Sequence, residues 1–328
     1  MEAPSPASPP DRTPVQGVVV RSTGSWYAVM PDAGGEVIQA RARGRFRLQS
    51  EDVDETNPVA VGDRVMVRPE PDGTGLITEI LPRRNQLSRR AAGRRTGREH
   101  VIVANVDAAW VVQSTFDPQF NAGFVDRVLV MAEAHYLDAG VIVNKVDLLA
   151  GEDTAQEVVE FWTELYRSLG YPVLWTSARE GTGVPALRDA LAGRTSVLTG
   201  QSGVGKSSLL NAVEPGLGIR TAEVSKRTRK GRHTTTFATL HSLSGGGFVV
   251  DTPGIREFGI WDMQPAELAG YFVEMQPLVE HCRYPSCTHD HEPGCAVAAA
   301  VDAGAISQER YGSYLAILAS LREGDGGR

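Results

Sequence analysis

The sequence has no long apolar segment. Its best candidate for a membrane span, residues 101–112, is shorter than the roughly 20 residues that a spanning helix needs, and Asn105 and Asp107 interrupt it. Residues 1–14 also lack the apolar core of a signal peptide; they carry five prolines and are expected to form a disordered tail. We therefore expect a globular, cytoplasmic protein, and 328 residues are enough for two or three domains.

An excess of positive charge is also lacking. The net charge of −7 argues against a protein that coats polyanions with its whole surface. Two stretches are nevertheless basic, with seven arginines within residues 83–98 and six Lys or Arg within 220–232. Such runs are usually solvated charge on a flexible linker, but two of them in an acidic chain make phosphate binding an equal alternative.

A phosphate-binding loop is the clearest motif, and it stands between a predicted strand and a predicted helix. Its glycines let backbone N–H groups turn toward phosphate oxygens, and the helix N-terminus adds a favourable dipole. Lys206 is expected to neutralise the β- and γ-phosphates, and Ser207 to ligate Mg²⁺. The predicted nucleotide-binding residues here are Gly200, Gln201, Ser202, Gly203, Val204, Gly205, Lys206, Ser207 and Ser208.

A second motif predicts which base the nucleotide carries. An apolar strand runs directly into Asn-Lys-x-Asp at residues 144–147. The Asp147 carboxylate can accept from both N1–H and the 2-amino group of guanine, whereas adenine has no such donor pair, so an ATP-using kinase is disfavoured. Asn144 is expected to brace the loop and the Lys145 stem to cover the base. Ser177 and Ala178 form the loop that would contact guanine O6.

The region after the phosphate loop predicts a nucleotide-sensing switch. Residues 217–232 are rich in Gly, Thr and basic residues, and a threonine that closes onto Mg²⁺ and the γ-phosphate is expected just beyond them. Thr235 is the first choice and Thr234 the second. After the next strands, Asp251 fits the carboxylate that supports the metal, and the Gly254 amide fits the γ-phosphate contact.

These motifs occur in a rotated order, since the guanine motif precedes the phosphate loop. Such a circular permutation is physically tolerable because the ends of a domain usually lie close together at its surface. We expect a multidomain chain with a disordered tail (1–14), an oligonucleotide-binding (OB)-like barrel (15–82), a basic linker (83–100), a circularly permuted α/β GTPase domain (101–264), a helical zinc-binding domain (265–322) and a frayed tail (323–328).

The barrel is predicted from five or so short β-rich runs, 59–61 among them, that Gly, Pro, Asp and Asn separate. Four arginines alternate with other residues after residue 40, so an extended strand would place them on one face. Such a row suits a phosphate backbone; a barrel edge protected by charge is the alternative. The RNA-binding candidates are Arg41, Arg43, Arg45, Arg47, Arg89, Arg90, Arg94 and Arg95.

All three cysteines lie within 14 residues near the C-terminus. Three thiolates and one imidazole make a closed tetrahedral zinc site with a structural role, and a disulfide with one spare thiol is the competing interpretation. His291 is an alternative histidine ligand, and His281 would have to fold back. The favoured ligands are Cys282, Cys287, His289 and Cys295. Helices are expected at 265–272 and 307–321.

Together these motifs closely resemble the ribosome small-subunit-dependent GTPase A family, also called RsgA or YjeQ. The resemblance rests on the permuted order, on the Gly-Arg-His-Thr-Thr-Thr segment at 231–236, on Asp-Thr-Pro-Gly-Ile-Arg-Glu-Phe-Gly at 251–259 and on the Cys-x4-Cys-x-His-x5-Cys spacing. It implies a GTP hydrolase that acts late in assembly, binds the immature or newly finished 30S subunit, contacts 16S rRNA through the barrel and zinc domain, and leaves after hydrolysis. Separately from the resemblance, we expect a monomer.

One departure from other GTPases concerns catalysis. Ile255 occupies the position where many of them place a water-orienting Gln, and an apolar side chain cannot polarise water. We hypothesise slow intrinsic hydrolysis, a site that the ribosome completes, and His233 as the residue that positions water beside Lys206 and Thr235. Alternatively His233 only contacts rRNA or packs in the switch. Competing functions are an RNA-binding scaffold whose hydrolysis is incidental and a GTPase that acts on tRNA or another ribonucleoprotein.

Overall fold

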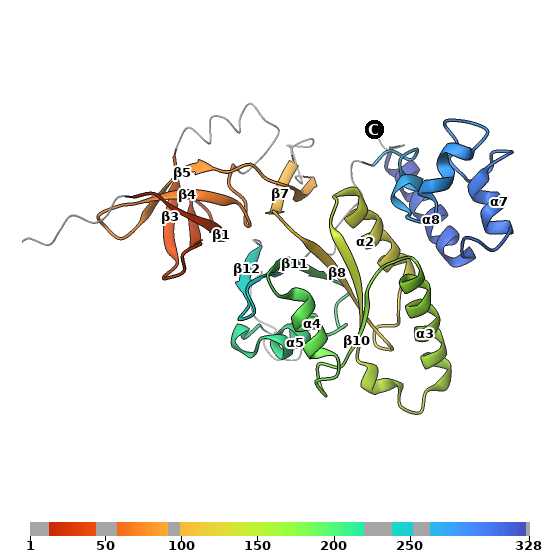
Figure 1. Cartoon of the computed structure of the whole chain (residues 1–328), viewed down its shortest axis with the longest axis horizontal. Helices are drawn as coiled ribbons and strands as arrows, with labels where there is room; N and C mark the ends of the chain where they lie inside the picture. Colours follow the sequence, from red (N-terminus) through yellow and green to blue (C-terminus); the bar gives the residue numbers. More distant parts are fainter. Residues whose placement is uncertain (1–12, 44–57, 91–98, 220–237, 252–262, 326–328) are drawn as a thin grey trace, which may run out of the picture. The chain divides into compact units, whose positions relative to one another are not determined.

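The computed structural model describes residues 13–43, 58–90, 99–219, 238–251 and 263–325 (Figure 1). These residues divide between two compact units, of which the first is formed mainly by the chain up to Val106 and the second mainly by the chain from Asp107 onward. Within the described ranges, no helix is both long and apolar enough to cross a bilayer.

The first unit contains the expected five-stranded barrel. Its strands pair in the order β1-β2-β3-β5-β4, and pairing of β4 with β1 closes the ring. All neighbours are antiparallel except β3 and β5. Alternate residues of the strands fill the interior with small and branched side chains such as Val19, Val65 and Ile77. The strands are β1 (Val15–Thr23), β2 (Trp26–Pro31), β3 (Ile38–Ala42), β4 (Arg64–Pro69) and β5 (Gly75–Ile80).

Residues 59–61, expected as a strand, instead form a buried turn whose single bridge joins Val61 to Val103. The reason lies in the buried Asp63 side chain, which accepts a 2.7 Å hydrogen bond from the Ala60 N–H and so closes the turn. Arg83 binds the same carboxylate through two nitrogens at 2.8 and 3.0 Å. This bidentate pair fixes the end of the barrel to the chain that follows it.

The expected basic linker, residues 83–100, is not a plain linker. It contains β6 (Gln86–Arg90) and the start of β7 (Glu99–Ala104), which pair antiparallel. Apolar residues at alternate positions account for the strands, since Leu87 and Val103 are almost completely buried. The expectation of a linker rested on the arginines and did not include β6.

The second unit is built on a parallel sheet in the order β10-β9-β8-β11. Helices α2 and α3 lie on one side of the sheet, and α4 and α5 on the other (Figure 1). The bounds are β8 (Ala108–Ser114), α2 (Ala122–Ala134), β9 (Asp138–Asn144), α3 (Asp153–Ser168), β10 (Val173–Thr176), α4 (Val184–Leu191), β11 (Arg194–Thr199), α5 (Lys206–Val213), β12 (Thr239–Ser242) and β13 (Gly247–Asp251).

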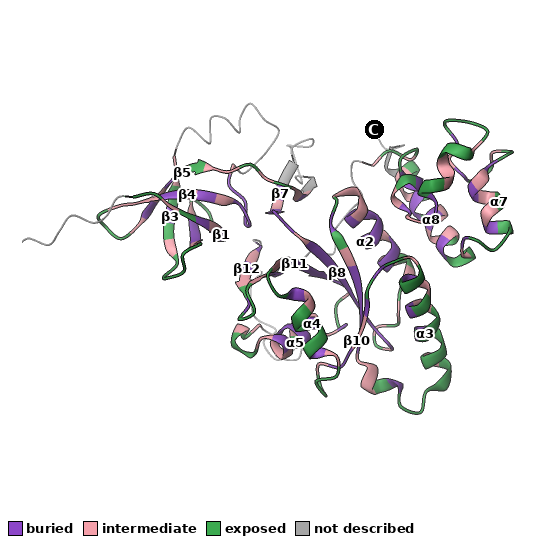
Figure 2. Ribbon diagram, viewed as in Figure 1, coloured by how far each residue is buried: buried purple, intermediate pink, exposed green. Residues whose placement is uncertain are grey.

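Strand β8 lies at the centre of this sheet, and all seven of its residues are buried, as the purple ribbon in Figure 2 shows. Such a continuous apolar run is typical of a parallel strand covered on both faces. The parallel register brings Ser114, Asn144 and Thr176 to one edge of the sheet. Ligands of open α/β sheets bind beyond this carboxyl edge, so the fold itself positions a site there.

The C-terminal part of the second unit is helical. Its elements are the short 3₁₀ helices η3 (Leu268–Tyr271) and η4 (Gln276–His281), then α7 (Ala296–Asp302) and α8 (Gln308–Asp325). The helix expected at 265–272 is reduced to η3, because Phe272 adopts an extended conformation and inserts into the core. Helix α8 runs past residue 321 to Asp325, into the segment expected to be frayed.

Candidate nucleotide and metal sites

The phosphate-binding motif forms a tight loop between β11 and α5. Gly200, Gly203 and Gly205 all have positive φ, and Val204 is completely buried, which anchors the loop in the core between α4, α5 and β8. The Lys206 Nζ donates to the backbone oxygens of Gly200 at 2.6 Å and Gln201 at 2.9 Å, so the ammonium group lies on the inner side of the loop. Ser207 follows in the first turn of α5.

Asn144 joins the loop to the predicted guanine motif. This side chain is 1% exposed; its Nδ2 donates to the Val204 oxygen at 2.9 Å, and its Oδ1 accepts from Thr176 Oγ1 at 3.1 Å and from the Ala178 N–H at 3.3 Å. A Cβ atom on Gly205 would lie 2.4 Å from Nδ2, so glycine is required there. One buried amide thus connects three segments that are far apart in the sequence.

Asp147 lies beside this junction. Its Oδ1 accepts a 2.6 Å hydrogen bond from the hydroxyl of Ser177, which is completely buried and therefore fixed in place. Lys145, two residues before Asp147, adopts the left-handed conformation (φ 65°), and its Nζ donates to the backbone oxygen of Asp117. A carboxylate held at the carboxyl edge of the sheet, next to a phosphate-binding loop, is suited to accept from the donors on a guanine edge.

Part of the predicted site falls outside the described residues. His233, Thr234, Thr235, Gly254 and Ile255 belong to that group. The backbone of Asp251 forms the last residue of β13.

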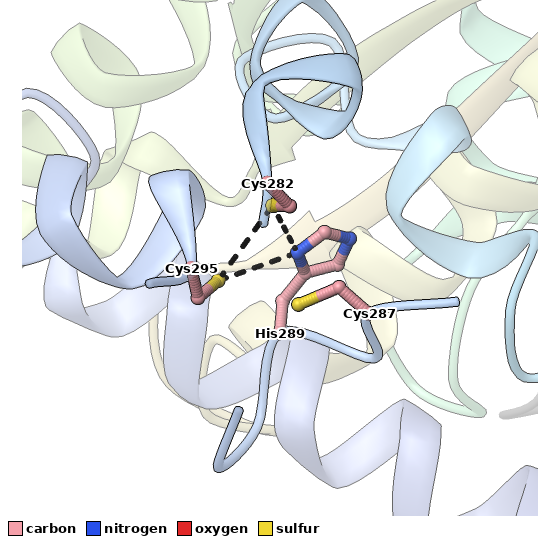
Figure 3. A group of neighbouring side chains, drawn as sticks. All are labelled: Cys282, Cys287, His289 and Cys295. Atoms are coloured by element: carbon pink, nitrogen blue, oxygen red, sulfur yellow. Dashed lines mark hydrogen bonds between the residues drawn. The ribbon is translucent and has the colours of Figure 1, made fainter. Parts of the chain in front are cut away.

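The predicted zinc ligands come together in the C-terminal part (Figure 3). Nδ1 of His289 lies 3.4 Å from the sulfurs of both Cys282 and Cys295, which are 4.0 Å apart, and all four ligand atoms, including Cys287 Sγ, lie within 4.8 Å of one another. A tetrahedral zinc ion would place its sulfurs about 3.8 Å apart and a nitrogen about 3.5 Å from each. The donor set and its spacing therefore fit one zinc ion.

The surroundings of the cluster hold the ligands in place. Tyr311 and Tyr314 donate through their hydroxyls, both at 2.7 Å, to the backbone oxygens of His289 and Thr288. Burial lowers the pKa of His289, which favours the neutral imidazole that binds metals, and raises the pKa of the Cys287 thiol to about 12. Metal binding must therefore displace thiol protons.

The other two histidines considered as ligands lie outside this group. His291 is largely exposed beside Asp290, and His281 is exposed at the end of η4. With four protein ligands and no open position, the arrangement is that of a structural zinc site.

Comparison with known proteins decides the family. The family described as RsgA GTPase matches residues 80–261, and the RsgA N-terminal domain matches residues 16–77. The chain belongs to the RsgA GTPase family. It is therefore a GTP hydrolase. In its sequence the guanine motif precedes the phosphate loop, which is the circularly permuted order.

Individual relatives match along nearly their whole length. "Small ribosomal subunit biogenesis GTPase RsgA 2" of Bacteroides thetaiotaomicron is 42% identical over 310 residues, which cover 94% of this chain and 98% of the relative. The RsgA GTPase of Gemmatimonas aurantiaca is 44% identical over 311 residues, with the same coverage.

Two solved structures share the fold. The crystal structure of YjeQ from Thermotoga maritima is 36% identical with a TM-score of 0.78, and covers 94% of this chain and 98% of its own. That of YloQ, described as a circularly permuted GTPase, is 29% identical with a TM-score of 0.75, and covers 97% of this chain and 98% of its own.

The arginine candidates lie only partly within the described residues. Arg41 lies on β3 with its guanidinium carbon 4.0 Å from the centre of the Trp26 ring, a cation–π contact across neighbouring strands. Strand β3 ends at Ala42, so Arg43 lies just beyond it. Arg89 and Arg90 belong to β6. Arg45, Arg47, Arg94 and Arg95 lie outside the described residues.

A buried ion-pair network was missed by the sequence analysis. Arg310 of α8 is 1% exposed; its Nη1 donates to Asp126 of α2 at 2.6 Å, and its Nε and Nη2 donate to Glu274 at 2.7 and 3.1 Å. The Tyr166 hydroxyl donates to the same Asp126 oxygen at 2.9 Å. Burial raises the pKa of Asp126, while the Arg310 charge opposes that rise.

This network joins the zinc-binding part to the GTPase helices α2 and α3. The Arg310 guanidinium also stacks on Phe272, at 4.5 Å from the ring centre. The sequence contains one signal for it: Arg310 is the polar member of an apolar helical stripe with Tyr314 and Ile317, both buried.

Proposed function

We propose that GTP lies across the carboxyl edge of the sheet, with its phosphates on the loop at residues 200–207 and its guanine against Asp147. The observation that carries this proposal is the set of three hydrogen bonds made by Asn144, which bring the phosphate loop, the guanine motif and the 176–178 loop together. Backbone N–H groups and Lys206 would bind the phosphates, and the loop of Ser177 and Ala178 would contact O6 of the base.

The catalytic part of the site is proposed from the sequence. Ser207, Asp251 and Thr235 would hold Mg²⁺, which neutralises phosphate charge when it is bound. His233 would position the attacking water, because Ile255 offers no polar group for that purpose. If so, His233→Ala abolishes stimulated hydrolysis and leaves GTP affinity unchanged. Full stimulated turnover in this variant would leave His233 as a packing or rRNA-contacting residue.

We further propose that the cellular role of this chain is that of the relatives named small ribosomal subunit biogenesis GTPases. It would act in the cytoplasm as a monomer on the late 30S subunit, contact 16S rRNA through the barrel and the zinc-binding part, and dissociate after hydrolysis. The cation–π pair of Arg41 and Trp26 presents a positive charge and an aromatic ring together, which suits RNA.

Co-sedimentation tests this role. The chain loaded with a non-hydrolysable GTP analogue is expected to sediment with purified 30S subunits, and the chain loaded with GDP to remain in the supernatant. Lys206→Ala, which removes the charge at the phosphate loop, should abolish the difference between the nucleotides. Binding to free tRNA in place of 30S subunits would favour the alternative function on tRNA or another ribonucleoprotein.

A further inference from the structure

Helix α3 exposes an apolar stripe that the GTPase site does not use. Val158 and Phe161 are each 47% exposed, and with the half-buried Leu165 they follow the i, i+3, i+7 spacing of one helix face. Figure 2 shows most of α3 in the colour of exposed residues. Among all described residues only six large apolar side chains are exposed, so two on one helix face form a distinct patch.

The patch borders a groove of about 850 Å³ between α3 and the edge strand β10. Phe161, Leu165 and Trp175 line it. Its walls are well fixed, because the Trp175 indole N–H donates to Thr163 Oγ1 at 2.8 Å and Phe161 packs edge-to-face on Trp162 at 5.2 Å. A groove with fixed aromatic walls can receive an apolar anchor with little loss of side-chain entropy.

The charge beside this stripe is negative. Glu157, Glu160 and Glu164 repeat the same i, i+3, i+7 spacing, and the last two line the groove. The one basic side chain of α3, Arg167, also lines the groove, but its guanidinium donates to the backbone oxygen of Val173 on the edge strand at 3.0 Å, which leaves the two glutamates in excess. Phosphate groups are repelled from such a surface, whereas Lys and Arg side chains are attracted to it.

We propose that this groove, lined by α3 and β10, binds a Lys/Arg-rich peptide segment of a protein partner that inserts an aromatic or aliphatic anchor beside Phe161. The apolar stripe provides the anchor site, and the parallel row of carboxylates selects the basic residues that flank the anchor. The surface is distinct from the nucleotide site, and the proposal stands whether or not the partner belongs to a ribosomal particle.

Fluorescence anisotropy with a labelled twelve-residue peptide of alternating Lys or Arg and Leu or Phe tests the proposal on the full-length protein. Phe161→Ala is expected to weaken binding about tenfold, as truncation of a central anchor does, and Glu160→Gln with Glu164→Gln to weaken it about fivefold with a reduced salt dependence. The matched controls are Val37→Ala, another exposed apolar residue, and Asp189→Asn with Asp302→Asn, which removes two charges elsewhere. Both controls should bind within twofold of the parent.

Three results would overturn the proposal that this groove binds a basic peptide. Equal losses in the α3 variants and the controls would show that the peptide responds only to net charge. Binding of a labelled twelve-nucleotide RNA that depends on Phe161 would make the groove an RNA site. Self-association that Phe161→Ala abolishes would make the occupant a second copy of this chain. Because all substituted side chains are exposed, unchanged circular dichroism is expected and confirms that each variant is folded.

Discussion

Replacement of Arg310 by methionine tests how the zinc-binding part is held to the GTPase helices. Methionine keeps much of the apolar stem but removes the guanidinium that Asp126 and Glu274 share. The side chains of these two carboxylates are 0% and 9% exposed, so neither gains water in exchange. Removal of one partner from such a buried pair leaves uncompensated charge in the core.

The expected loss follows from that geometry. Breaking a buried ion pair from one side costs about 3–5 kcal/mol, and lost stacking on Phe272 adds to this, so Arg310→Met should lower the free energy of unfolding by about 4 kcal/mol. Adding Asp126→Asn and Glu274→Gln removes the stranded charges, and should restore about 2 kcal/mol while the amides remain imperfectly paired. Arg322, on the same helix, forms a solvent-exposed ion pair with Asp290 and provides the control, since Arg322→Met should cost less than about 1 kcal/mol.

The destabilisation caused by Arg310→Met should depend on pH in a definite direction. Burial raises the pKa of Asp126, and without Arg310 nothing charged opposes that rise. Below pH 3.8, the ordinary pKa, such a carboxyl is protonated in both the folded and the unfolded chain. As the pH rises above 3.8 the unfolded chain loses this proton first, so the folded state becomes less stable relative to the unfolded state. The destabilisation by Arg310→Met should therefore be smaller at pH 5 than at pH 7.

Urea unfolding followed by circular dichroism at 222 nm measures these effects. All helices in the described part of the chain lie in the second unit, so this signal reports on that unit. A loss below about 1 kcal/mol for Arg310→Met, or a triple variant no more stable than the single one, would refute the argument that the stranded carboxylates dominate.

Three further predictions concern the sites. Asp147→Ala should weaken GTP binding about a hundredfold in a nucleotide titration and leave weak ATP binding unchanged, because only guanine loses hydrogen bonds to the carboxylate. Gly205→Ala should abolish GTP binding, since the new Cβ would lie 2.4 Å from Asn144 Nδ2 in a backbone with φ of 93°, whereas Gly216→Ala, with no atom within 4 Å, should bind GTP normally. Cys287→Ser, or prolonged treatment with a zinc chelator, should release the metal and reduce helicity, while His291→Ala should retain one zinc per chain by elemental analysis, because His291 is exposed and apart from the cluster.

Features with local chemistry were predictable from the sequence. The phosphate loop and the guanine motif each combine a short residue pattern with the end of an apolar strand. The zinc group was predictable because three scarce cysteines and a histidine lie close together in sequence. In each case the residues that give the signal lie within a short segment of the sequence.

Features set by distant partners were not predictable. The Arg310–Asp126 pair joins residues 184 positions apart, and no local pattern indicates which carboxylate a buried arginine meets. The 59–61 turn depends on the Asp63 side chain, which in turn binds Arg83. Strand β6 carries Leu87 as its one apolar residue and is recognisable mainly through its pairing with β7.

Phosphate release from GTP, measured with and without purified 30S subunits at two salt concentrations, tests the central claim most directly. The account predicts slow release by the chain alone, large stimulation by the subunits, and loss of that stimulation at high salt as phosphate contacts weaken. Rapid release without subunits, unchanged when they are added, would contradict it, because the chain would then contain a complete catalytic site of its own.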